Sequence, residues 1–229
     1  MTMTTYEDIV REACGRWTDP QQRSKDILSG ATAYHEAGHA VAFYVLLFPP
    51  EWIWVGHDGG SVSPGWRVAM AGLHHPPHWW VNRRLVASLA GRVTDALVTG
   101  GPIDYYGGPR GGDRAGEARD LDSIAPGFSR TREGRRYRDR LRKATKAFVR
   151  SWWPEIDALA RTLWSRAVAD EDFITGMSGD EAAAIVGAVR GRKSAPMPAD
   201  APESLHWPSD AEIIQQAMQA HEQQAAASN

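Results

Sequence analysis

The feature that most constrains this chain is the run Y-H-E-A-G-H-A, which begins at residue 34 inside an apolar stretch closed by Pro49-Pro50. This pattern predicts a helix over about residues 32–47. Residues four apart lie on one helical face, so His35 and His39 can each direct a ring nitrogen at one metal ion. Glu36 lies beside that ion without binding it. The spacing H-E-x-x-H therefore predicts a zinc (Zn²⁺) site in which Glu36 takes a proton from water.

A catalytic zinc needs a third protein ligand and an open position. The pattern H-E-x-x-H-x-x-G-x-x-H is excluded, because the chain has Ala42 and Val45 where glycine and histidine are required. Glu51 follows too closely to lie on a later helix. The residues alone leave the remaining carboxylates open as candidates: Asp58, Asp95, Asp104, Asp113, Glu117, Asp120 and Asp122.

The order of apolar and turn residues predicts an α+β fold that is mainly α-helical, with a small β-hairpin or sheet. The second long helix is expected over residues 78–99, where apolar residues recur at three- and four-residue spacing. Besides the two long helices, the expected elements are helices over 4–17, 115–124, 131–153, from 154 onward and 178–191, a connection over 24–30, and strands over 52–55 and 65–70.

The length and composition favour one domain with extensions. The chain has 229 residues, of which 42% are hydrophobic, which is enough for one core and short for two. We expect residues 1–29 to form an N-terminal helix and connection, and residues 30–192 to form the domain. Residues 193–229 are rich in proline, alanine, serine and glutamine, which favours a linker followed by a flexible or helical tail.

The net charge, the cysteine content and the length of the apolar stretches indicate the cellular compartment in which the chain is expected. The net charge is −2 and Cys14 is the only cysteine, so a disulfide framework within the chain is excluded. The longest apolar stretch, residues 40–48, is far shorter than the roughly 20 residues that span a bilayer. We therefore expect a soluble protein of the cytoplasm, without a membrane partner.

The segment Arg130–Arg150 is strongly basic. It holds ten of the 26 lysines and arginines and two acidic residues, so its charge is +8 while the rest of the chain carries −10. Aromatic residues are sparse there, which favours a solvated helix that pairs with the acidic remainder or a second subunit. The alternative is a surface for an acidic partner or nucleic acid.

Three segments, in order, resemble the peptidase domain of the FtsH-type membrane AAA zinc metalloproteases. They are Y-H-E-A-G-H-A-V-A from residue 34, L-A-G-R-V-T-D-A-L-V-T-G from residue 89, and G-E-A-R-D-L-D-S-I-A from residue 116. The resemblance covers about residues 30–187 and implies a zincin-like fold. It also implies that Asp120, in the D-L pair, is the third zinc ligand, with Asp122, Asp113 and Glu117 as alternatives. Asp95 stands where that family has glutamate.

The chain lacks the G-x-x-x-x-G-K-[ST] phosphate loop, so the resemblance implies a stand-alone, ATP-independent peptidase domain without the ATPase module. Its expected substrate is an unfolded protein or peptide, which the strand over 65–70 would hold through backbone hydrogen bonds. A hydrolase of small amides is one alternative. A non-catalytic zincin-fold binding module, acting through the basic segment, is the other. We expect a monomer or small homo-oligomer.

Overall fold

A computed structural model of the chain describes residues 3–47, 49–64, 78–101, 111–123 and 126–190. These residues form helices joined to one small antiparallel sheet, which confirms the expected mainly helical α+β class. The elements are α1 (Tyr6–Arg16), α2 (Pro20–Leu46), β1 (Pro50–Gly56), β2 (Gly59–Pro64), α4 (His78–Thr99), α5 (Gly111–Asp122), the 3-10 turn η1 (Phe128–Arg130), α6 (Arg132–Ser151), α7 (Trp153–Ala169), β3 (Thr175–Ser178) and α8 (Gly179–Arg190).

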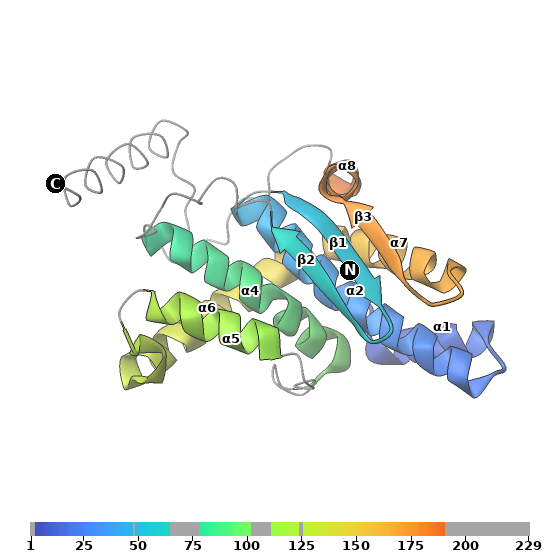
Figure 1. The fold of residues 1–229 in the computed structure, drawn as a ribbon, viewed down its shortest axis with the longest axis horizontal. Coiled ribbons are helices and arrows are strands. Elements are labelled where there is room, and N and C mark those ends of the chain that lie inside the picture. The colour runs from blue at the N-terminus through green and yellow to red at the C-terminus, as the bar shows by residue number, and fades with distance from the viewer. Residues whose placement is uncertain (1–2, 48, 65–77, 102–110, 124–125, 191–229) are drawn as a thin grey trace.

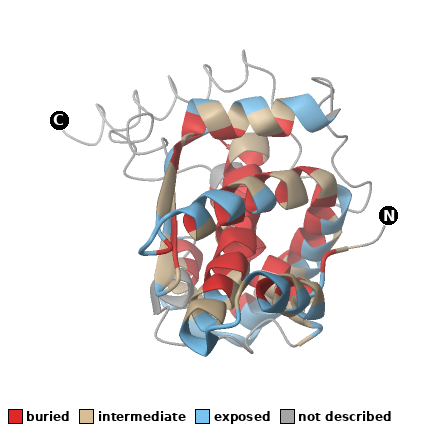
Figure 2. Ribbon diagram, turned by 90° about the vertical axis from the view of Figure 1, so that its right-hand side faces the viewer, coloured by how far each residue is buried: buried red, intermediate tan, exposed pale blue. Residues whose placement is uncertain are grey.

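Helix α2 runs through the middle of the fold, with α4 and α5 on one side and α7 and β3 on the other (Figure 1). From Thr32 to Phe43 every residue of α2 is buried. Figure 2 shows the buried residues gathered on the central helices and the exposed ones on the outer turns. A helix that is covered on all sides holds its side chains in fixed positions, and the two histidines lie within this stretch.

The sheet has the strand order β2-β1-β3, and both pairings are antiparallel. Ile53 and Val55 of β1 and Met177 of β3 are buried on its inner face. The alternate residues of β1 face outward, so Trp52 is half-exposed rather than part of the core. The sheet therefore covers α2 with one face and leaves β2 at its edge.

Helix α2 begins twelve residues earlier than the expected start at residue 32, so the prediction of a connection over 24–30 is wrong. Asp19 caps the helix by accepting from two backbone amides, and Pro20 occupies its first turn. Gly30 lies inside the helix, and its missing side chain leaves room for Trp164, because a Cβ atom there would lie 2.9 Å from that ring. The boundary expected between the N-terminal segment (1–29) and the domain (30–192) thus falls inside α2.

A buried carboxylate ties this first part of α2 to its neighbours. Asp26 is fully buried and accepts hydrogen bonds from Arg16, Trp17 and Trp164, at 3.1, 3.0 and 2.5 Å. We expect Asp26→Ala to lower the free energy of unfolding by about 1–3 kcal/mol, because it leaves the buried indole N–H of Trp164 without its acceptor. Urea unfolding followed by circular dichroism measures this. The control is Glu7→Ala on exposed α1, and equal stability of both variants would contradict the role of Asp26.

Of the other expected helices and strands, some are confirmed and others differ in position. The helix over 78–99 is confirmed as α4, and Ser178 accepts from the Glu181 amide at the start of α8. The second hairpin strand comes earlier than expected, as β2, and the predicted strand over 65–70 lies outside the described residues. Strand β3 was not predicted. No helix among the described residues is long and apolar enough to cross a membrane.

Candidate metal site

Helix α2 brings His35 and His39 together, as their spacing predicts. Their Nε2 atoms lie 3.1 Å apart, and the two residues are 4% and 6% exposed. One helical turn separates them, so both rings leave the same face of α2 and meet in the space between α2 and α4. The site is thus a buried pair of imidazoles between two packed helices.

The outer nitrogen of each imidazole is held by α4. His35 Nδ1 donates to a carboxylate oxygen of Asp95 at 2.7 Å, and His39 Nδ1 donates to the carbonyl oxygen of Ala87 at 2.7 Å. A carbonyl only accepts, so His39 carries its proton on Nδ1, and its Nε2 presents a lone pair when the ring is neutral. Such a second bond fixes the tautomer and orientation of metal-ligating histidines.

The separation of the two Nε2 atoms fits a zinc ion. Tetrahedral geometry with Zn–N bonds of 2.0–2.1 Å requires two ligand nitrogens about 3.3 Å apart, and the observed separation is 3.1 Å. The same distance also suits a hydrogen bond from a doubly protonated His35 to His39. The metal content of the purified protein distinguishes the two states.

Two glycines allow this close approach of helices. A Cβ atom on Gly91 of α4 would lie 2.3 Å from His39 Nε2 and 2.9 Å from His35 Nε2. On α2, a Cβ atom on Gly38 would lie 2.4 Å from Thr94 Oγ1 and 3.0 Å from a backbone oxygen of α4. The shortest distance at each glycine, 2.3 Å at Gly91 and 2.4 Å at Gly38, is shorter than real Cβ contacts, so any larger residue would push the helices apart or displace the imidazoles.

Glu36 lies between α2 and the edge strand of the sheet. It is 5% exposed, and a Cβ atom on Gly60 of β2 would lie 2.7 Å from its Oε1. The carboxyl group therefore lies directly against the backbone of β2. The candidate base therefore lies beside an edge strand, and it comes from the same turn of α2 as His35 and His39.

Asp120 is buried on α5, where its carboxylate pairs with Arg84 of α4 at 2.6 Å. Burial raises the pKa of Asp120 to about 6, against the opposing effect of Arg84. Arg84 lies one turn before Ala87, on the same stripe of α4 as Gly91 and Asp95. Asp120 is thus held by the α4 face that meets the histidines. Among the described residues, however, no three His, Cys, Asp or Glu side chains gather closely enough to hold a metal.

The alternative carboxylates have other roles. Glu117 is buried and bonds to Arg92 at 2.8 Å, with Arg138 at 3.4 Å, which joins α4, α5 and α6. Asp122 accepts from the backbone amide of Ser129 at 2.8 Å. The position of the Asp113 side chain lies outside what the structure describes, as does that of Asp104.

Sequence reasoning did not identify the residues of α4 that support the site. Asp95 was only one of several candidate ligands, and the structure places it as the acceptor that holds His35. Within the L-A-G-R segment, Gly91 makes room for the imidazoles, and Arg92 anchors α5 through Glu117. A glycine inside an apolar helix was the available signal, since it marks close approach by another group.

We expect Asp95→Ala to weaken zinc binding by about 10- to 100-fold, because His35 loses the acceptor that fixes its ring. Competition with a fluorescent zinc chelator measures the affinity. Asp58→Ala removes an exposed carboxylate from the hairpin turn and serves as the matched control. Unchanged zinc affinity in Asp95→Ala would show that its bond to His35 does not support a metal.

No protein-family model matches the chain, and no curated protein matches it either. The assignment of a function therefore depends on the geometry described above and on the sequence motif.

Proposed function

We propose that this protein is a zinc-dependent peptidase that hydrolyses peptide bonds without ATP. The observation that carries the proposal is the pair of Nε2 atoms 3.1 Å apart, with both Nδ1 atoms hydrogen bonded to α4. An ordinary pair of helical histidines exposed to solvent would need neither buried acceptors nor a glycine opposite the rings.

His35 and His39 would hold the metal, with Asp120 as the third ligand. When bound, zinc acts as a Lewis acid toward a carbonyl oxygen and makes water a stronger acid. The choice of Asp120 is supported by its burial and by its contact with the α4 stripe that faces the histidines. Glu117 is less suitable, because two arginines of other helices, Arg92 and Arg138, already bind its carboxylate. Asp122 is less suitable, because its carboxylate accepts from the backbone of the turn that follows α5.

Glu36 would act as the general base. Its carboxylate takes a proton from the attacking water and later delivers this proton to the nitrogen of the leaving amine. The side chain is buried against Gly60, so its position is fixed before substrate arrives. The Nδ1 protons of His35 and His39 stay on the rings during the reaction and are hydrogen bonded to Asp95 and to the Ala87 carbonyl. Neither imidazole is therefore needed as an acid or base.

The neighbouring strand supports a polypeptide as substrate. Within the described residues β2 pairs only with β1, so it is an edge of the sheet beside Glu36. An edge strand offers unpaired backbone groups to an extended chain, which can add to the sheet as a further strand. An unfolded protein or flexible peptide presents such a chain. A small amide lacks the backbone to use this edge.

Metal content provides the first test. We expect elemental mass spectrometry to find about one zinc per chain in the wild type and much less in Asp120→Ala, since a structural or catalytic zinc needs at least three protein ligands. Circular dichroism shows whether the variant is folded. Hydrolysis of a fluorescently quenched unfolded protein, inhibited by a chelator, completes the test. A wild type that takes up no zinc after supplementation would overturn the proposal, and a zinc that persists in Asp120→Ala would assign the third ligand elsewhere.

A further inference from the structure

Helix α6 carries a row of exposed cations on its outer face. We call the following seven residues the basic stripe: Arg132, Arg135, Arg136, Arg140, Lys143, Lys146 and Arg150, all of them exposed. At 1.5 Å per residue the stripe is about 27 Å long. Two exposed acids, Glu133 and Asp139, interrupt it.

The other described elements provide no ion-pair partner for the basic stripe. Within the described part of the chain, the ion pairs of α6 are made by Arg138 with Glu117 and by Arg142 with Asp139. Arg138 thus pairs with the acidic remainder at Glu117, whereas the seven cations of the basic stripe have no such ion pair among the described residues. Within the part of the chain that the structure describes, the basic stripe therefore keeps a net positive charge, and the acidic remainder directs any polyanion toward this face.

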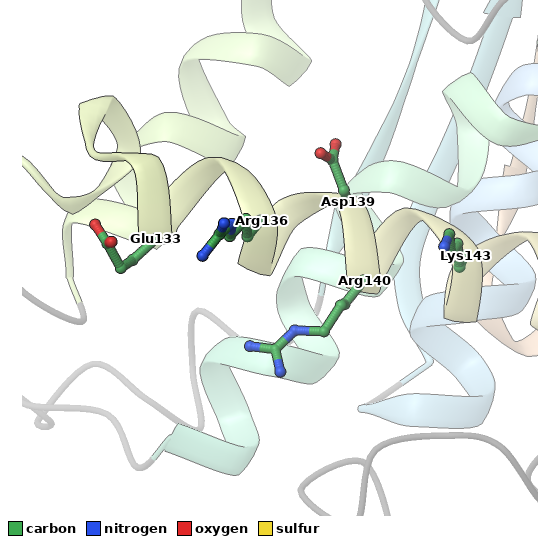
Figure 3. Close-up of a pocket in the computed structure, with 5 residues that line it drawn as sticks. All are labelled: Glu133, Arg136, Asp139, Arg140 and Lys143. Carbon is green, nitrogen blue, oxygen red and sulfur yellow. The ribbon is translucent and has the colours of Figure 1, made fainter.

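A hollow lies along the middle of the stripe. Arg136, Arg140 and Lys143 line it together with Glu133 and Asp139 (Figure 3). In the close-up the side chains of Asp139 and Arg140 point away from each other. The three cations lie one turn apart along α6, so they can contact successive negative groups on a linear partner.

The apolar residues of α6 argue against a membrane or a protein as that partner. Leu141, Phe148 and Val149 are buried in the core, so the helix has no apolar face to insert into lipid. The exposed large hydrophobic residues of the described chain lie on other elements, whereas stable protein interfaces have an apolar centre. Tyr137 is half-buried and Phe148 is buried, so α6 itself offers bases no exposed aromatic ring for stacking.

We propose that the basic stripe binds the phosphate backbone of duplex nucleic acid without reading its sequence. Phosphates suit this surface, because they are spaced regularly along a rigid rod and are contacted by arginine and lysine side chains alone. Arginine, which predominates in the stripe, can donate two parallel hydrogen bonds to one phosphate. The binding is independent of the zinc site.

The test measures fluorescence anisotropy of a short labelled DNA duplex over a range of salt concentrations. We expect Arg136→Gln/Lys143→Gln to bind on the order of tenfold to a hundredfold more weakly at about 0.1 M salt, and its log–log salt slope to flatten by about two units. Arg11→Gln/Lys25→Gln removes two cations outside the basic stripe, the exposed Arg11 of α1 and the half-buried Lys25 of α2, and we expect it to bind as the wild type does. Thermal unfolding confirms that both variants are folded.

Three results would overturn the proposal. They are an absence of duplex binding by the wild type at low salt, an equal loss in both double variants, and binding to anionic phosphatidylserine vesicles but not to DNA. An equal loss would mean that net charge, rather than the basic stripe, determines the affinity.

Discussion

Glu36→Gln is expected to abolish hydrolysis while leaving the metal in place. A glutamine side chain has nearly the shape of glutamate but cannot take a proton from water, and a positioned general base contributes about 10²- to 10⁴-fold to the rate. Glu36 is buried against Gly60, so the isosteric amide can occupy the same space. We therefore expect kcat on a quenched unfolded substrate to fall by about a thousandfold, with KM and zinc content nearly unchanged.

Glu51→Gln is the matched control, because Glu51 is exposed on β1 and has no place in the proposed chemistry. Wild-type rates in Glu36→Gln would show that Glu36 is not the base. A loss of zinc together with activity would show instead that Glu36 takes part in holding the metal. Measurement of zinc content on the same samples separates these two outcomes.

The local pattern was sufficient where a contact is made within one element. The proximity of His35 and His39 was predicted from their spacing alone, because the helix itself determines which side chains share a face. Helix α4 was predicted to the residue from its apolar periodicity. In both cases the information needed lies within a few turns of chain.

Local pattern failed where long-range packing decides. Strand β3 has four residues, too few to show alternation, and it exists because it pairs with β1 far away in sequence. Gly30 resembles a helix breaker, yet its missing side chain makes room for Trp164. Asp95 becomes a partner of His35 only through the packing of α4 on α2, which no single segment encodes.

The glycine opposite the histidines gives the sharpest test of the metal site. We expect Gly91→Ala to abolish stoichiometric zinc binding and hydrolysis, because its Cβ atom would lie 2.3 Å from His39 Nε2, in the space that the two imidazoles share. The clash falls on the end of a side chain, so the imidazole can move away without unfolding the helices. Alanine also favours a helix by about 1 kcal/mol over glycine.

The zinc content and the stability, measured together, distinguish a metal site that is blocked by the alanine side chain from a damaged fold. Gly187→Ala in α8 is the control, since no atom lies within 4 Å of its added Cβ, and it should keep its zinc. Equilibrium unfolding in the presence of chelator compares the two proteins without metal, and we expect both to be at least nearly as stable as the wild type. Normal zinc content in Gly91→Ala would mean that the metal, if bound, lies away from the paired Nε2 atoms. A large loss of stability without metal would instead assign Gly91 to the packing of α4 on α2.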